Sequence, residues 1–219
     1  MIEHHIQKDI ITRLSQAREL RFSELKPAQL ESNSFMYHVK QLITSGFVEK
    51  TDTGYTLTPA GLTYVDGLSL KSSRPRKQAK ILSVIVLKNK QGQYVLARRK
   101  YQPFIDTFLF PGGKQHYGES PEDHVRRELQ EQFGLTGTPR RRGLVDQRSY
   151  SRGTLITHVL THVYELVYEG VVPPESPKFV YEWSYVEDAH RLYPGTYELY
   201  QALEHEENLF FLSLDVSAD

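Results

Sequence analysis

The sequence predicts a small, mainly helical domain followed by a larger α/β domain. A Ser/Pro/basic stretch, LKSSRPRKQA, separates the two parts and shows no periodic apolar pattern. Apolar residues at helical spacing come before this stretch, and β-branched strand patterns mixed with two helical patterns come after it. We therefore expect domains at residues 1–70 and 80–219, joined by a basic linker at residues 71–79.

The helical spacing before the linker recurs in three segments. The first helix is expected near residues 6–17, and a short second helix is expected between a cap at Ser23 and Pro27. The third helix, SFMYHVKQLITSG, should be capped by Ser32 or Asn33. Its apolar face should consist of Phe35, Val39, Leu42 and Ile43.

A hairpin and a fourth helix are predicted next, from FVEKTDTGYTLTP and from Pro59 directly after Thr58. Three helices, a hairpin and a helix in this order resemble a winged helix-turn-helix domain. The resemblance implies that the third helix enters the major groove of double-stranded DNA. The side chains that this helix would present to DNA are Ser34, Tyr37, His38, Lys40 and Gln41.

Charge gives this DNA-binding hypothesis only partial support. The first domain holds about as many acidic as basic residues, whereas phosphate neutralisation normally supplies most of the affinity for DNA. Additional basic residues lie in and beside the linker, at Lys71, Arg74, Arg76, Lys77 and Lys80. The alternative is that the first domain mediates dimerisation or packs on its neighbour.

The second domain begins with two strand patterns, KILSVIVL and QYVLARR, on either side of the turn NKQG. A brief strand at residues 108–110 leads to Gly112 and Gly113, a long one spans residues 155–168, and helical patterns follow near the end. We interpret the basic run at residues 140–142 as a solvated turn. These elements predict a layered α/β domain around a central sheet.

One helix of this domain can be placed closely. Ser120 is a suitable N-cap, Pro121 suits the first helical position, and Gly134 is a typical stop, so the helix should run to about Phe133. On it, three side chains at positions i, i+3 and i+4 converge on one side: Glu128, Glu131 and Gln132. A solvated helix face is the simple explanation, but a carboxylate cluster beside a Gly-Gly loop also suits a hard cation and a diphosphate.

The spacing around this helix matches a known motif. Gly113, five residues, Glu119, seven residues and then RELQEQFGL resemble the Nudix box of the Nudix hydrolases at every fixed position but one. LARRK and FLFPGGK before the box and EWSYVEDAHRL after it extend the likeness over about residues 80–203. The resemblance implies an α/β/α sandwich with a mixed sheet. It also implies an enzyme that uses Mg²⁺ or Mn²⁺ to cleave nucleoside diphosphate derivatives.

The resemblance also implies a role for each residue of the box. Glu119 and Arg127 would pair to fix the loop against the helix. Glu128 and Glu131 would hold the divalent cation, assisted by the carbonyl near Gly112 or Gly113, and Gly134 completes the motif. Gln132 stands where the family usually has another glutamate, often a direct ligand. A neutral amide there lowers the negative charge of the site and hence its affinity for the cation.

Four residues outside the box are further candidates. Glu175, in the loop VVPPESPK, is expected to supply a further ligand or general base, and Glu182 is the second choice; the alternative for both is a surface acid. Arg98 and Arg99 end a strand near the box and are candidates to bind substrate phosphate, or else exposed strand-end charges.

Two functions from different classes follow from these observations. The first is a metal-dependent Nudix hydrolase that cleaves the diphosphate of a nucleoside diphosphate linked to another group. The second is a transcriptional regulator whose Nudix domain senses a nucleotide metabolite with little or no turnover. The lack of cysteine excludes thiolate metal sites and disulfides. With no bilayer-length apolar run and no signal-peptide pattern, we expect a cytoplasmic protein with no membrane partner, and a homodimer.

Overall fold

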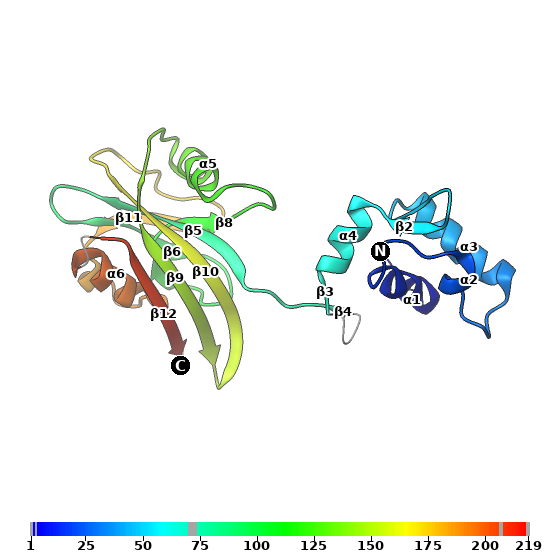
Figure 1. Cartoon of the computed structure of the whole chain (residues 1–219). Helices are drawn as coiled ribbons and strands as arrows, with labels where there is room; N and C mark the ends of the chain where they lie inside the picture. Colours follow the sequence, from blue (N-terminus) through cyan, green and yellow to red (C-terminus); the bar gives the residue numbers. More distant parts are fainter. Residues whose placement is uncertain (1, 3, 70–73, 206–207, 218–219) are drawn as a thin grey trace. The chain divides into compact units, whose positions relative to one another are not determined.

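The computed structural model describes residues 2, 4–69, 74–205 and 208–217. The chain divides into two compact units, Met1–Lys77 and Gln78–Asp219 (Figure 1). The expected linker falls partly outside the described residues. Its described part is not wholly irregular, because β4 (Arg74–Pro75) pairs antiparallel with β3 (Leu68–Ser69). The Nε atom of Arg76 also donates to the Leu68 carbonyl, at 2.7 Å.

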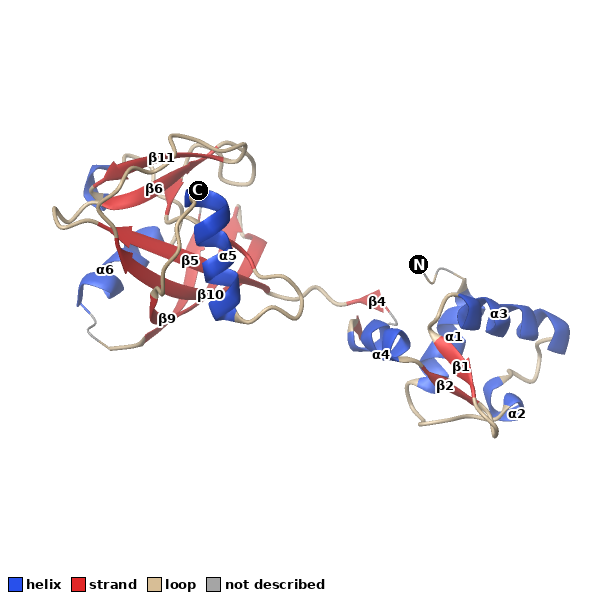
Figure 2. Cartoon of the chain, turned by 90° about the horizontal axis from the view of Figure 1, so that it is seen from above, coloured by secondary structure: helices blue, strands red, loops and turns tan. Residues whose placement is uncertain are grey.

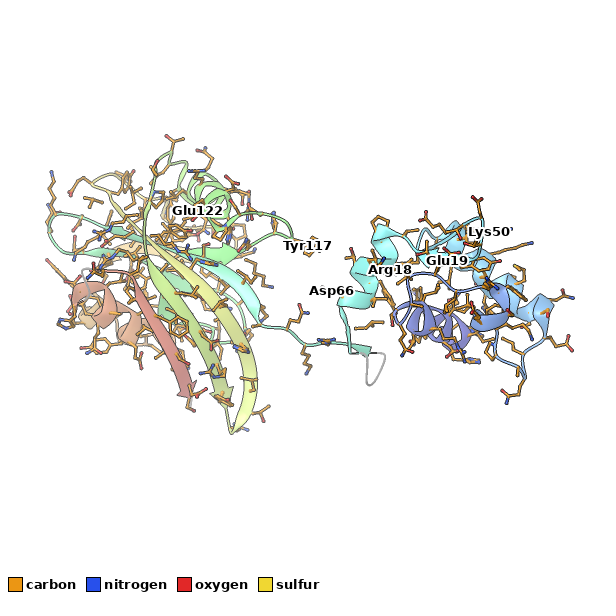
Figure 3. The ribbon with its side chains drawn as sticks, viewed as in Figure 1. Arg18, Glu19, Lys50, Asp66, Tyr117 and Glu122 are labelled. Atoms are coloured by element: carbon orange, nitrogen blue, oxygen red, sulfur yellow. The ribbon has the colours of Figure 1, made fainter. Side chains whose placement is uncertain are left out.

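The N-terminal unit contains helices and a small sheet in the predicted order. The elements are α1 (His5–Leu14), α2 (Phe22–Leu25), α3 (Ser32–Thr44), β1 (Val48–Lys50), β2 (Tyr55–Leu57) and α4 (Pro59–Asp66). Ile10, Leu25, Phe35 and Leu42 lie in its core. Glu19, which is labelled in Figure 3, ties the turn between the two strands to the rest of the unit. Its carboxylate accepts hydrogen bonds from the Thr51 and Thr53 hydroxyls.

Three details of this unit differ from the sequence-based expectation. The cap of α2 is Arg21, not Ser23, because the Glu24 side chain turns back and accepts from the Arg21 backbone N–H at 2.7 Å. The cap of α3 is Glu31, so Ser32 already lies inside the helix. Ile43 is exposed, since it follows buried Leu42 by one residue, about 100° of helical rotation.

The C-terminal unit is built on a mixed sheet with the strand order β11-β6-β5-β10-β9-β12. β10 runs parallel to β5 and β12 runs parallel to β9, while the other pairs along this path are antiparallel. The strands are β5 (Lys80–Lys88), β6 (Tyr94–Arg99), β7 (Phe108–Leu109), β8 (Gly112–Lys114), β9 (Arg140–Ser151), β10 (Thr154–Val167), β11 (Phe179–Ser184) and β12 (Phe210–Ser217). The predicted α/β sheet domain is confirmed.

Helices cover both faces of this sheet (Figures 1 and 2). α5 (Pro121–Phe133) packs on one face through Val125 and Leu129, and α6 (Thr196–His205) packs on the other through Leu199 and Leu203. A short 3-10 helix, η1 (Val186–Asp188), precedes α6. Two hydrophobic cores therefore form, one on each side of the strands, and the first of them fixes the position of α5.

The basic run at residues 140–142 was wrongly interpreted as a turn. It begins β9, and Arg142 is buried and paired with Glu165. The ion pair through Nη1 and a hydrogen bond from Nη2 to the Leu203 carbonyl at 3.0 Å compensate for part of the cost of burying this guanidinium. Among the described helices, none combines the length and the apolar character that a membrane span requires.

Candidate active site

The site lies where β8 ends and α5 begins. β8 pairs antiparallel with β5, which places Gly112 and Gly113 against the middle of the sheet. The sequence-based placement of α5 is confirmed. Ser120 caps the helix by accepting from the Asp123 N–H at 3.1 Å, and it donates its own hydroxyl to the Asp123 carboxylate. Gly134 ends the helix with a φ of 66°, a conformation that favours glycine.

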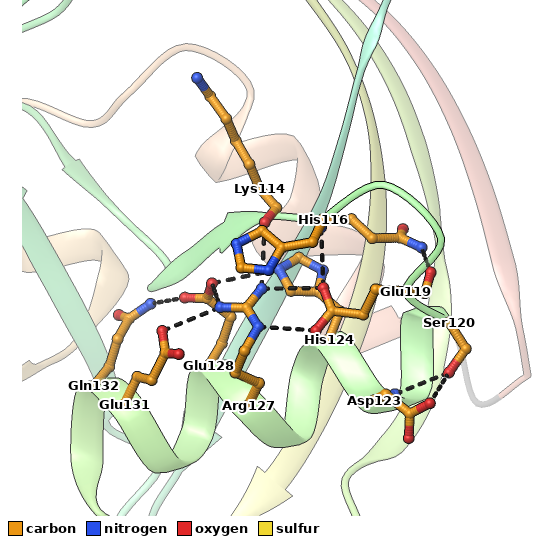
Figure 4. Close-up of polar contacts among 11 residues, drawn as sticks. Lys114, His116, Glu119, Ser120, Asp123, His124, Arg127, Glu128, Glu131 and Gln132 are labelled. Atoms are coloured by element: carbon orange, nitrogen blue, oxygen red, sulfur yellow. Dashed lines mark hydrogen bonds and ion pairs between the residues drawn. The ribbon is translucent and has the colours of Figure 1, made fainter. Parts of the chain in front are cut away.

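Glu119 and Arg127 form a two-pronged ion pair that ties the loop to the helix (Figure 4). The Glu119 carboxylate accepts from Arg127 Nε at 2.8 Å and from Arg127 Nη2 at 3.1 Å, and it also accepts from the His116 backbone N–H at 3.0 Å. The bonds from Arg127 lower the pKa of Glu119 to about 2. The loop is therefore held by a charged clamp at neutral pH.

Glu128 is the buried carboxylate of the site. Arg127 Nη1 donates to its Oε1 atom at 2.9 Å, and the ring Nε2 atom of His124 lies 3.4 Å from the same oxygen. Burial tends to raise the pKa of Glu128, but His124, Gln132 and Arg127 outweigh that effect and lower it. The carboxylate lies so close to the loop that a Cβ atom at residue 113 would be 2.2 Å from Oε1. Glycine at position 113 is thus what allows Glu128 to reach the loop.

Gln132 takes part in the same network as a donor. Its Nε2 atom donates to Glu128 Oε2 at 2.5 Å and to the Gly112 carbonyl at 3.2 Å, while its Oε1 atom accepts from the Tyr181 hydroxyl at 3.1 Å. Glu131 is more exposed and accepts from Arg127 Nη1 at 3.0 Å. α5 therefore brings Glu128, Glu131 and Gln132 together on one side, around Arg127 and the glycine loop.

The oxygen atoms of this site are suitable ligands for a hard divalent cation. Carboxylates of Glu128 and Glu131, the Gly112 carbonyl and the Gln132 amide oxygen are all oxygen ligands of the kind that Mg²⁺ and Mn²⁺ take. The missing Cβ atom at Gly113 lets the Glu128 carboxylate approach the backbone of the loop. In the described part of the chain, no three His, Asp or Glu side chains form a metal-binding group.

Comparison with known families agrees with this geometry. A family model described as NUDIX domain matches residues 79–203, more than half of the chain. This chain belongs to the NUDIX domain family. A second family model, a domain of unknown function (DUF7347), matches residues 1–68. The chain thus contains a NUDIX domain, its N-terminal part is similar to DUF7347, and the winged helix-turn-helix interpretation of that part stays a prediction.

Individual relatives resemble only part of the chain. It is 41% identical over 51 residues to an 8-oxo-dGTP diphosphatase of Haemophilus influenzae, and 39% identical over 56 residues to one of Escherichia coli. The matches cover 23% and 25% of this chain, and 38% and 43% of those proteins. A MutT protein of Bacillus halodurans superimposes with a TM-score of 0.53 at 21% identity, over 64% of this chain and 92% of that one, and therefore shows a shared fold alone.

The two arginines proposed for phosphate binding point to opposite sides of β6, as consecutive strand residues do. Arg98 pairs with Asp106 at 3.0 Å and is half-buried. The Arg99 guanidinium lies over the Tyr101 ring at 4.1 Å, and its buried Nε atom has no hydrogen-bond partner among the described residues. The two side chains therefore cannot clamp one phosphate together.

The two further acidic candidates lie outside the network of the NUDIX box. Glu175 is exposed, and its carboxylate pairs with Lys100 at 2.5 Å. Glu182 is also exposed and borders a depression of about 530 Å³ next to Val171 and Trp183. As a catalytic base, Glu175 would first have to separate from Lys100, since a carboxylate held by an ammonium group is a weak proton acceptor.

The predicted DNA-binding residues of α3 do not all reach its surface. Ser34, Tyr37, Lys40 and Gln41 are exposed, but His38 is only 8% exposed and its ring stacks on His4 at 4.1 Å. The proposal of His38 as a groove-reading residue was therefore wrong. It lies next to Val39 and three residues after Phe35, on the part of the helix that faces the core.

Sequence reasoning missed the partner of Gln132. Tyr181 lies forty-nine positions away, in β11. No motif connects a strand residue with the NUDIX box at that distance. A weaker signal was present, because period-two alternation in FVYEWS places Tyr181 and Trp183 on the same face of a strand, and both residues pack in the core under α5.

Proposed function

We propose that the NUDIX domain binds a nucleoside diphosphate linked to another group and hydrolyses its diphosphate with Mg²⁺ or Mn²⁺. The observation that carries this proposal is the arrangement around Arg127, which bonds Glu119, Glu128 and Glu131 at once. Arg127 thereby holds Glu128 and Glu131 on one side of α5, and Glu128 lies against the loop at Gly113.

Each residue of the proposed site has a separate role in the proposed reaction. Arg127 orients Glu128, and together with His124 and Gln132 it lowers the pKa of that carboxyl group despite burial. Glu131, which is exposed, provides an oxygen at the open side of the site. Arg99 is proposed to bind a substrate phosphate through its guanidinium group. A bound divalent cation would supply charge compensation for the diphosphate and an activated water molecule.

A substrate panel tests this proposal directly. Phosphate or nucleotide release is measured for nucleoside diphosphate derivatives and for 8-oxo-dGTP, with Mg²⁺ and with Mn²⁺. 8-oxo-dGTP belongs in the panel because two relatives are named as its diphosphatases. We expect turnover that is enhanced in Gln132→Glu and abolished in Glu128→Gln. If neither the natural chain nor Gln132→Glu released product from any compound, the hydrolase proposal would be refuted.

Gln132 also favours a second candidate, a regulator whose NUDIX domain binds a nucleotide metabolite with little turnover. The Gln132 amide brings no charge to the cation site, and the chain carries an additional N-terminal domain. In this proposal α3 presents Ser34, Tyr37, Lys40 and Gln41 to double-stranded DNA.

Binding to DNA upstream of the protein's own coding sequence tests the regulator. Affinity should fall steeply with salt concentration, and it should fall further when Lys40 and the basic residues at 71–80 are neutralised. Glu24→Gln is a suitable control, since it removes a charge from α2, outside α3. Equally weak binding to all DNA sequences would contradict the proposal.

A further inference from the structure

The orientation of the Gln132 amide depends on one residue outside the NUDIX box. We infer that Tyr181 is a positioning residue: it holds Gln132 so that the amide NH₂ group, and not the amide oxygen, faces Gly112 and Glu128. In this orientation Gln132 opposes cation binding at its own site. The inference rests on the proposed cation site, and it concerns how strongly that site binds its ion.

Three hydrogen bonds define the orientation of the amide (Figure 4 shows its bond to Glu128). Gly112 presents a carbonyl and Glu128 an ionised carboxylate, and both groups can only accept. The amide must therefore present Nε2 to them, at 3.2 and 2.5 Å. The Tyr181 hydroxyl then donates to Oε1 at 3.1 Å from the opposite side. Each end of the amide thus has a partner of the right kind.

The surroundings of Tyr181 keep its hydroxyl committed to this bond. The side chain is 4% exposed and packs edge-on against Phe133, with ring centroids 5.3 Å apart. Burial raises the pKa of Tyr181, so the hydroxyl keeps its proton and remains a donor. Its other polar neighbour, Ser176 Oγ, is at 3.4 Å, a longer and weaker contact.

The bonded amide competes with a divalent cation for the same oxygen atoms. The Glu128 carboxylate and the Gly112 carbonyl are two of the oxygen ligands proposed for the ion, and both already accept from Gln132. For Gln132 to present an oxygen to the ion, the amide must turn and break all three bonds. The turned amide would present Nε2 to the Tyr181 hydroxyl, which would have to accept from it and donate its own proton to Ser176 at the longer distance.

Removal of the hydroxyl should therefore strengthen cation binding. In Tyr181→Phe the Gln132 amide oxygen loses its buried donor. The amide orientation that opposes the cation is then less stable relative to the turned orientation. The net contribution of one neutral hydrogen bond corresponds to roughly a threefold to tenfold change in affinity. Gln132→Glu should raise affinity by more than this, because it adds a charged ligand.

Mn²⁺ binding to the full-length chain tests the inference, with free Mn²⁺ measured by electron paramagnetic resonance. Tyr164→Phe is the matched control: Tyr164 is also a buried tyrosine under α5, but its hydroxyl donates to Glu122 at 3.0 Å, outside the Gln132 network. We expect tighter binding in Tyr181→Phe and unchanged binding in Tyr164→Phe. Equal affinity in Tyr181→Phe and the natural chain, or an equal gain in the control, overturns the inference.

The outcome with Gln132→Glu separates this inference from the proposed function. If no variant binds Mn²⁺, including Gln132→Glu, the cation site itself is refuted. If Gln132→Glu binds Mn²⁺ and Tyr181→Phe shows no gain, only the role of Tyr181 is refuted.

A second measurement uses the natural chain and does not depend on the folding of a variant. The side-chain NH₂ signal of Gln132 in NMR spectra, assigned by its loss in Gln132→Glu, should be protected from solvent exchange without metal. Mg²⁺ should shift that signal, because the amide has to turn and its NH₂ group then leaves Glu128 and Gly112. An unprotected signal before Mg²⁺ is added would overturn the inference as well.

Discussion

The Glu119–Arg127 clamp leads to a prediction about stability and its pH dependence. Glu119→Gln removes a carboxylate that accepts two bonds from Arg127 and one from a backbone N–H. The lowering of its pKa from 4.5 to about 2 corresponds to about 3 kcal/mol at neutral pH. Since the ion pair remains partly open to solvent, the expected loss of unfolding free energy in Glu119→Gln is smaller, about 1–2 kcal/mol.

The sign of the pH effect follows from the direction of the pKa shift. A carboxyl group with a lowered pKa in the folded state stabilises that state above its unfolded pKa of 4.5 and loses this contribution as pH falls toward 2. The difference in unfolding free energy between Glu119→Gln and the natural chain should therefore be full at pH 7. It should narrow steadily below about pH 4.5.

Denaturant unfolding followed by tryptophan fluorescence measures this difference in the right domain. Trp183 is the single tryptophan of the chain and lies in β11 of the NUDIX domain. Glu175→Gln is the control, since the same substitution there removes only an exposed pair with Lys100. A destabilisation of Glu119→Gln that stayed constant from pH 7 to pH 3, or none at pH 7, would refute the reasoning.

Three further predictions concern single positions. Gly113→Ala should destabilise the NUDIX domain by about 1–3 kcal/mol and lower its Mn²⁺ affinity, because the new Cβ would lie 2.2 Å from Glu128 Oε1. Gly137→Ala is the control: the nearest atom there is at 3.5 Å, so the free energy of unfolding should change little in the same fluorescence assay. Gly134→Ala should lower the free energy of unfolding by about 1 kcal/mol, because the residue has a φ of 66°. An unchanged denaturation midpoint would contradict this. His38 should titrate below pH 6.5 in NMR spectra because burial lowers its pKa, so the N-terminal unit should lose stability as pH falls below 6.5; a value at or above 6.5 would contradict the burial argument.

Local chemistry made α5 and its ends predictable from sequence. Ser120, Pro121 and Gly134 act on the backbone within one turn of themselves, so their effects do not depend on the rest of the fold. The same holds for Thr58 and Pro59 at the start of α4. The convergence of side chains on α5 was predictable for the same reason, since helical geometry alone determines it.

Features that depend on contacts distant in sequence were not predictable in this way. Arg142 resembles a solvated charge in a basic run, yet Glu165 on the neighbouring strand makes it a buried residue of β9. Histidine is a polar residue type that could face a DNA groove, yet the position of His38 around α3 places it on the buried side of the helix. In both cases the polar side chain was assigned to the surface by its type, whereas the partner that stabilises it inside could not be found from the sequence alone.

Gln132 shows how these two kinds of information combine. The motif shows that a neutral residue replaces a carboxylate, and from charge alone this means a weaker cation site. The structure adds that the amide is a hydrogen-bond donor to Glu128, oriented by Tyr181 from another part of the sheet. The expected loss of affinity at the proposed cation site then has two components, the missing charge and the bonds that must break. Gln132→Glu removes both components, while Tyr181→Phe weakens only the second, so measuring the two variants together separates them.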